Sequence, residues 1–242
     1  MILAYPFIAF FISIALKTNF ITTIFLFLAI PSIYVTIKGK NDVKKSLVFA
    51  LLVGISAVLL IDPIAETAMI WGISTIFPKL FGIIPLEQFV WGILFCYFIV
   101  QAYEVKFDKN DHKVLHERFK YFFLVAFLAF LAEVYYLIMR PNWEYIYILG
   151  GSILFLLPIT SLLIVHLNFR KKFFKSSFYT AYLFLFFELA ALINGNWFFP
   201  GKYIASILIM NHAFPLEEFI FFVLLGNAGV LTFYEFFDDD RK

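Results

Sequence analysis

Two short strings in the chain, Pro85-Leu86-Glu87-Gln88-Phe89 and Pro215-Leu216-Glu217-Glu218-Phe219, are nearly identical and lie 130 residues apart. Each opens an apolar stretch that closes with a tyrosine–glutamate pair, Tyr103-Glu104 in one case and Tyr234-Glu235 in the other. A separation of more than half the chain predicts two tandem copies of one structural unit. Each copy places carboxylic acids at the edge of an apolar stretch, where charge is costly, so these acids are candidates for function.

The composition predicts an integral membrane protein. Of the 242 residues, 63% are hydrophobic, 21% aromatic and only 15% charged, and the mean hydropathy is +0.90. A soluble domain carries roughly 25% charged residues, so this chain has too few charges to cover a surface that faces water. Its one cysteine, Cys96, lies within an apolar run, which excludes a disulfide framework. We expect no cleavable signal peptide, because the first apolar run lacks a basic leading segment.

Eight apolar segments are predicted to cross the membrane, because roughly 20 apolar residues span the hydrocarbon core. The predicted fold is therefore an all-α integral membrane protein. The approximate ranges are 2–16, 20–37, 46–64, 85–103, 120–139, 145–166, 174–193 and 214–236. With this arrangement only four of the 19 Lys and Arg residues fall on one side: Lys17, Lys79, Arg140 and Lys202. The positive-inside rule then predicts a multi-pass protein of the cell membrane with both termini in the cytoplasm.

Further matches extend the repeat beyond the two pentapeptides. Asp62 precedes Trp71 by nine residues, and Glu188 precedes Trp197 by the same distance. The offset between the copies grows from 126 residues at these positions to 130 at the pentapeptides, as an insertion in the intervening loop would produce.

We therefore predict two like-oriented three-helix repeats, with one extra helix before each, related by an axis along the membrane normal. The corresponding domains are residues 1–117 and 118–242.

The acids of both copies are expected at a similar depth near one face of the membrane. Six residues share this feature: Asp62, Glu87, Glu133, Glu188, Glu217 and Glu218. Glu87 follows Pro85, and Glu217 and Glu218 follow Pro215, so these three acids fall near the positive end of a helix dipole. The alternative interpretation is that they only stabilise the start of a helix and have no catalytic role. A carboxyl group at the depth of Glu188 is expected to be protonated or paired.

Other polar groups fit a structural role better. The two tyrosine–glutamate pairs are typical of residues at the membrane interface. The acidic segments Asp108–Asp111 and Asp238–Asp240 are predicted to be a solvated loop and a solvated tail. The histidines show no metal-ligand spacing, and neither a nucleotide-binding glycine loop nor a nucleophile elbow is present. We accordingly expect no metal, no cofactor and no nucleic-acid partner.

Aromatic side chains next to the acids are candidates for a cavity lining, because their π-faces stabilise cations. These candidates are Trp71, Phe89, Trp91, Trp197, Phe219 and Phe222, with Glu133 as a possible polar member. The other aromatic residues are interpreted as bulk hydrophobic residues.

The chain resembles the membrane-integral lycopene cyclase family in three segments of its second copy: Asn194–Phe198, Pro215–Phe219 and Tyr234-Glu235. That family includes bacterial and archaeal heterodimeric or fused cyclases and the cyclase half of fungal bifunctional carotenoid enzymes. The resemblance covers roughly residues 20–108 and 143–238. Family members carry an acid, a tryptophan and a Pro-x-Glu-Glu motif in each copy. Here Glu188 stands where the family usually has Asp, and Gln88 replaces the second Glu of the first copy.

The resemblance implies cyclisation of the acyclic ends of a lipid-soluble polyene, lycopene, to β-ionone rings, without net oxidation. Such chemistry needs an acid, a base and a dry cavity. Our hypothesis is that Glu217 or Glu218 is the general acid and that Glu188 shares or relays its proton. Glu87 and Asp62 would form the corresponding set in the first copy. The expected partners are the polyene, membrane lipid and enzymes of the carotenoid pathway.

Two other functions stay open. A carotenoid elongase or another prenyl-transferring enzyme would need aspartate-rich cytoplasmic motifs for magnesium and diphosphate, whereas most acids here lie near the other face. A proton-coupled transporter would also use internal repeats and buried acids. Its helices would be broken at matching positions, a condition that Pro31 and Pro158 meet.

Overall fold

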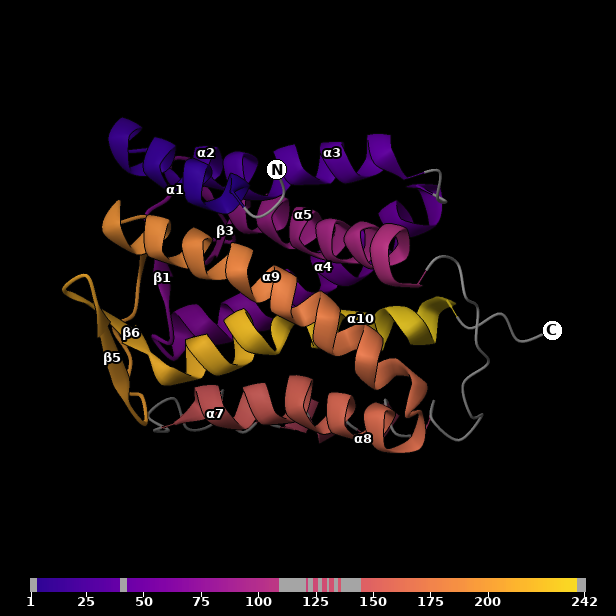
Figure 1. Ribbon diagram of the computed structural model, residues 1–242. Coiled ribbons are helices and arrows are strands. Elements are labelled where there is room, and N and C mark those ends of the chain that lie inside the picture. The colour runs from indigo at the N-terminus through magenta and orange to yellow at the C-terminus, as the bar shows by residue number, and fades with distance from the viewer. Residues whose placement is uncertain are drawn as a thin grey trace.

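The structure is a computed structural model that describes residues 4–39, 43–108 and 145–238, with a few single positions between 121 and 135. Its helices run roughly alongside one another in a bundle, and the short strands gather at one end (Figure 1). We call this end the hairpin end. The opposite end, where Tyr103 closes its helix, is called the tyrosine end.

The N-terminal half contains α1 (Tyr5–Leu16), α2 (Phe20–Ile24), α3 (Ile30–Lys38), α4 (Val43–Thr67) and α5 (Leu86–Tyr103). The C-terminal half contains α7 (Ile146–Gly151), α8 (Leu157–Val165), α9 (Asn168–Ile193) and α10 (Gly226–Asp238). Wider π-helical turns join or extend these helices at η1 (Phe25–Ala29), η2 (Glu104–Asp108), η3 (Ser152–Leu156) and η4 (Glu218–Leu224).

Three short antiparallel strand pairs connect the helices among the described residues. They are β1 (Gly72–Ile73) with β4 (Trp197–Phe198), β2 (Lys79–Leu80) with β3 (Ile84–Pro85), and β5 (Ser206–Ile209) with β6 (His212–Pro215). The first pair joins the two halves of the chain, with Gly72 opposite Phe198 and Ile73 opposite Trp197. The other two pairs are local hairpins, and each of them leads into one of the Pro-Leu-Glu motifs.

Five stretches of the described residues are long and apolar enough to cross a membrane: Phe20–Lys38, Val43–Thr67, Leu86–Asp108, Ile146–Val165 and Asn168–Ile193. The pair η4 and α10, which is bent by 48°, makes a sixth if it is counted as one span. Six of the eight predicted segments are thereby found as apolar helices when the bent pair is counted as one, which confirms the all-α fold and agrees with a multi-pass membrane protein. The predicted segment 120–139 lies mostly outside the described residues.

The predicted segment 2–16 is found as an apolar helix, but its described part is shorter than the other candidate spans. Helix α1 has 12 residues, which at 1.5 Å per residue is about 18 Å, against a hydrocarbon core of about 30 Å. It ends before Lys17, whose backbone is left-handed with φ 46°. Helix α1 packs against α9, and the Tyr5 hydroxyl donates a hydrogen bond to the carbonyl of Leu26 in η1.

The backbones of α4 and α5 are in close contact. A Cβ atom built on Gly54 would stand 2.7 Å from the carbonyl oxygen of Gly92, so the two helix backbones touch without side chains between them. Small residues allow such close approach of membrane helices. This contact holds Asp62 of α4 next to the start of α5.

Candidate functional site

The C-terminal half brings two acids together at the hairpin end. Glu188 of α9 is 0% exposed and Glu218 at the start of η4 is 2% exposed, and their carboxyl groups lie close enough to interact electrostatically. The hydroxyl of Tyr147, in α7, donates a hydrogen bond to Oε2 of Glu218. Within the part of the chain that the structure describes, neither carboxyl oxygen of Glu188 has a hydrogen-bond partner. The two acids therefore differ, because Glu218 accepts a hydrogen bond and Glu188 accepts none from the described residues.

The N-terminal half contains the matching pair with different chemistry. Nε2 of Gln88 donates a hydrogen bond to Oδ1 of Asp62 at 3.3 Å, and both side chains are buried. Oδ2 of Asp62 has no partner among the described residues. Since an amide does not release a proton as a carboxyl group does, this pair holds one titratable acid, whereas the pair of Glu188 and Glu218 holds two.

The first acid of each Pro-Leu-Glu motif binds loop backbone. Oε1 of Glu87 accepts hydrogen bonds from the N–H groups of Ile76 at 2.7 Å and Phe77 at 3.0 Å. Oε1 of Glu217 accepts one from the N–H of Ile204 at 2.6 Å. Each carboxyl group thereby fixes the chain that leads into the adjacent hairpin. This geometry separates Glu87 and Glu217 from the second residue of each motif, which faces the neighbouring helix.

A layer of aromatic rings joins the two halves beside these acids. Trp71 and Trp197 stack with ring centroids 6.2 Å apart and planes at 20°, and Trp71 meets Tyr147 at 5.5 Å. Trp91 lies 6.4 Å from Trp197 and 5.3 Å from Phe222. We call Trp71, Trp91, Tyr147, Trp197 and Phe222 the aromatic layer. Four of its members were predicted from the sequence. Nε1 of Trp91 and of Trp197 lacks a partner among the described residues.

The remaining predicted cavity residues are not part of the aromatic layer. Phe219 contacts Phe214, with ring centroids 6.5 Å apart. Phe89 is half-buried and makes no ring contact with the layer among the described residues. Glu133, the polar residue predicted for the same cavity, lies outside the described residues.

Hydrogen bonds from two asparagines hold the loop that carries Trp197. Nδ2 of Asn196 donates to the carbonyl of Thr18 at 2.8 Å, and Nδ2 of Asn194 donates to the carbonyl of Ser13 at 3.2 Å. The hydroxyl of Ser74 donates to the carbonyl of Gly195 at 2.7 Å. Short helix α1 and the segment after β1 therefore position this tryptophan from two sides.

Tyr203 links the loops of the two halves. Its hydroxyl donates to the carbonyl of Ile70 at 2.5 Å and accepts from the N–H of Gly201 at 2.9 Å. Partial burial raises the pKa of Tyr203 to about 12, since the phenolate would lose contact with water. The phenol therefore stays protonated at neutral pH and keeps its donor.

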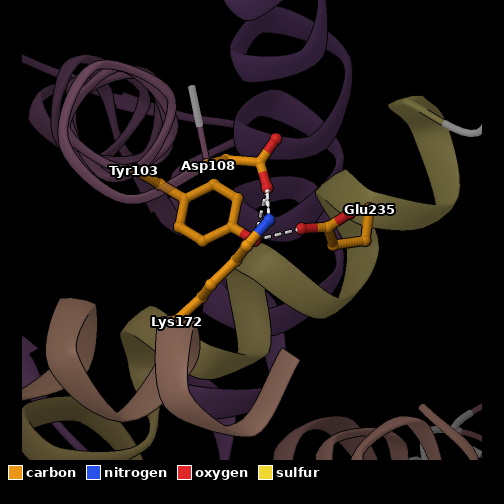
Figure 2. A network of polar contacts seen from close by, with 4 residues as sticks. All are labelled: Tyr103, Asp108, Lys172 and Glu235. Atoms are coloured by element: carbon orange, nitrogen blue, oxygen red, sulfur yellow. Dashed lines mark hydrogen bonds and ion pairs between the residues drawn. The ribbon is translucent and has the colours of Figure 1, made fainter. Parts of the chain in front are cut away.

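A second polar network closes the tyrosine end (Figure 2). The hydroxyl of Tyr103 donates a hydrogen bond to the carboxyl group of Glu235 and lies 3.4 Å from Oδ1 of Asp108. Nζ of Lys172 lies 2.5 Å from the same oxygen of Asp108. In the same region the hydroxyl of Tyr234 interacts with the carboxyl group of Glu104.

The network corrects two predictions. Both tyrosine–glutamate pairs are buried rather than interfacial, because η2, α5 and α10 cover one another there. Asp108 and Asp238 are buried as well, and they pair with Lys172 and Lys45 instead of standing in a solvated loop and tail.

Replacing Lys172 with methionine is expected to lower the free energy of unfolding by about 3 kcal/mol, because Asp108 would stay buried without the Lys172 cation. The measurement is thermal unfolding of the purified protein in detergent. Lys171→Met is the matched control, since Lys171 is the exposed neighbour on the same helix. Equal melting temperatures for the two variants would contradict a stabilising role of the ion pair.

Sequence reasoning missed Tyr147 and Tyr203. Tyr147 is one of 13 tyrosines and belongs to no motif, and its partner Glu218 lies 71 residues away. The only signal was its position near the start of an apolar span, which many tyrosines share.

Comparisons of the chain with protein-family models, with curated proteins and with solved structures found no match.

Proposed function

We propose that the chain is a carotenoid cyclase of the lycopene β-cyclase type, in which Glu188 protonates the polyene and Glu218 accepts a proton. The observation that carries the proposal is the buried pair itself. Glu218 receives a hydrogen bond from Tyr147, whereas Glu188 has no donor among the described residues. Two carboxyl groups in such proximity share their protons unequally. The donor-free member, Glu188, then carries the proton, and Glu218 carries the charge that Tyr147 stabilises.

The reaction follows from these roles. The proton of Glu188 adds to the terminal C=C bond of the substrate and leaves a tertiary carbocation. The π electrons of a neighbouring double bond attack this carbon, which closes a six-membered ring and moves the positive charge onto the ring. Glu218 then removes a proton from the adjacent carbon, and a new C=C bond forms. One proton enters and one leaves, so the product is an isomer of the substrate and no oxidant is required.

The aromatic layer supports the cation in this scheme. The faces of tryptophan attract positive charge better than those of other aromatic residues, and three tryptophans from two halves meet here. Their rings also exclude water, which would otherwise trap the carbocation as an alcohol. The site would thus combine a proton donor with a dry, electron-rich wall.

Two symmetric contacts support the tandem, like-oriented repeats and the two domains. In the β1–β4 pair, Gly72 faces Phe198, and each of them directly follows the tryptophan of its copy. At the other end of the bundle, Tyr103 contacts Glu235 and Tyr234 contacts Glu104, so the two tyrosine–glutamate pairs exchange partners. Equivalent residues meet in this way around a two-fold axis. An axis through both ends of the bundle runs along the membrane normal.

The repeats differ at the position where chemistry would occur. Gln88 takes the place of Glu218, and Gly92 takes the place of Phe222. In the first copy the helices touch at Gly54 and Gly92, while in the second Phe222 stands between α5 and α9, near Phe95 and Phe184. We infer one reactive centre, at Glu188 and Glu218, with the first copy supplying Trp71 and Trp91 as the facing wall.

Tyr147→Phe is expected to reduce ring formation by roughly 10-fold to 100-fold, because Glu218 would lose the donor that stabilises its charge and the base would form less readily. The measurement is the initial rate of cyclisation over a range of pH in proteoliposomes supplied with lycopene. Tyr145→Phe serves as the control, since Tyr145 is exposed at the start of α7. An unchanged rate and an unchanged pH profile would contradict the role of Tyr147.

The direct test of the function is expression in a host that accumulates lycopene, followed by separation of the pigments. Cyclised products should appear with this chain and be absent with the empty vector. Lycopene that stays acyclic in cells containing the folded protein in their membranes would overturn the proposal.

A proton-coupled transporter is the second candidate, and one observation favours it. The π-helical turns η1 and η3 lie at matching positions of the two copies, directly before Pro31 and Pro158. Transporter helices are commonly irregular at such paired positions. Proton uptake by proteoliposomes, followed with an enclosed pH-sensitive dye, would distinguish a transporter from a cyclase.

The elongase hypothesis gains no support. No group of three His, Cys, Asp or Glu side chains among the described residues has a metal-binding arrangement, and Asp108 and Asp238 are paired with lysines.

A further inference from the structure

Two hairpins at the hairpin end of the bundle are alike in construction. The β2–β3 hairpin leads into α5, and the β5–β6 hairpin leads into η4. The approach to each one is anchored by a buried carboxyl group, Glu87 in the first case and Glu217 in the second. The β5–β6 hairpin lies beyond the ends of the helices (Figure 1).

The tips of these hairpins are apolar and exposed. Phe81 is 83% exposed in the first hairpin, and Leu208 and Met210 are 76% and 63% exposed in the second. We call these three residues the hairpin tips. Residues 203–215 contain no Asp, Glu, Lys or Arg. In the first hairpin Lys79 is paired with Glu66 at 2.8 Å. An exposed loop with this composition is unfavourable in water.

The backbone at the tips is unusual for large side chains. Phe81 has φ 54° and Met210 has φ 50°, followed by Asn211 with φ 66°. The left-handed region favours glycine and asparagine, because a side chain crowds the backbone there. Each hairpin thus places a large apolar residue where a tight turn favours a small or polar one. Burial of these side chains in an apolar phase would compensate for that conformational cost.

We propose that the hairpin tips insert into the lipid leaflet at the hairpin end, at the boundary between the headgroups and the acyl chains. The occupant is lipid because the tips continue the apolar surface of the spans: Leu86, directly after the first hairpin, and Ile220 and Leu224, after the second, are also exposed. The hairpins therefore anchor the starts of the two acid-bearing helices to one leaflet. This inference depends on the membrane-spanning helices and not on the proposed cyclase activity.

The test is electron paramagnetic resonance of nitroxide labels on the protein in phosphatidylcholine nanodiscs. Single cysteines replace Phe81, Leu208 or Met210, and the unmodified chain reports the background from buried Cys96. Oxygen concentrates in lipid, whereas a nickel chelate stays in water. Phe178→Cys gives the lipid reference, since Phe178 is exposed in the apolar helix α9. Lys171→Cys gives the aqueous reference.

We expect the ratio of oxygen to nickel accessibility at the hairpin tips to exceed that at Lys171 several-fold and to stay below that at Phe178, which lies deeper in the span. A ratio like that of Lys171 at all three positions would overturn the proposal. Exclusion of both reagents would overturn it as well, because it would show that protein covers the tips, for example a second copy of the chain. Because three positions in two hairpins are tested, the failure of one variant to fold leaves the test intact.

Discussion

Replacing Glu188 with glutamine is expected to reduce β-ring formation at least about 100-fold, because the amide has no proton to give to the polyene and general acid catalysis contributes 10²–10⁴-fold. Glu218→Gln should cause a loss of similar size, since the carbocation would find no base to remove its proton. The measurement is the yield of cyclised pigment in a lycopene-accumulating host, normalised to the amount of folded protein in the membrane.

Glu217→Gln is the matched control for these variants. Its side-chain carbonyl can still accept the hydrogen bond from the N–H of Ile204, so the loop stays in place and most of the activity should remain. Wild-type yields from Glu188→Gln or from Glu218→Gln would refute the assigned roles. Loss of activity in Glu217→Gln alone would move the reactive centre to the first acid of the motif.

Gly54→Leu is expected to destabilise the protein by about 3 kcal/mol or more, because overpacking a close contact forces backbone shifts. A Cβ atom at this position would lie 2.7 Å from the Gly92 carbonyl oxygen and 2.9 Å from the Ile93 nitrogen. These are backbone atoms, so no side-chain rotation relieves the clash. The helices α4 and α5 would have to separate, which would also part Asp62 from Gln88.

The prediction is measured as the melting temperature of the purified protein and as the folded fraction in the membrane. Ser56→Leu adds the same side chain two residues away, on the exposed face of α4, and should leave both quantities unchanged. If the Gly54→Leu and Ser56→Leu variants had equal stability, the contact between α4 and α5 would be looser than it is in the structure.

Many features of this protein could be predicted from local sequence. Six helical spans follow from hydropathy, since burial in lipid requires long apolar runs. Asp62, Glu188 and Glu218 were expected at similar depth near one face, and the structure places Asp62 beside Gln88 and Glu188 beside Glu218. The exception is α1, a helix of twelve residues that packs on α9 and is shorter than the other candidate spans.

The tyrosine end shows where local reasoning failed. A tyrosine and a glutamate at the end of a span are typical of the membrane interface, and nothing near Tyr103 in the sequence indicates otherwise. Its hydroxyl meets Glu235, which lies 132 residues away. Burial at this end arises only because spans from the two halves converge there.

The sequence by itself therefore determined the class of the protein, the positions of six spans and the acids worth testing, because composition and spacing act along the chain. Only the tertiary structure decided how these acids are used. It showed that Glu87 and Glu217 bind loop backbone, that Tyr147 selects Glu218 over Glu188, and that tryptophans of both halves stack together. Such contacts join residues far apart in the chain, and their geometry depends on how the helices pack.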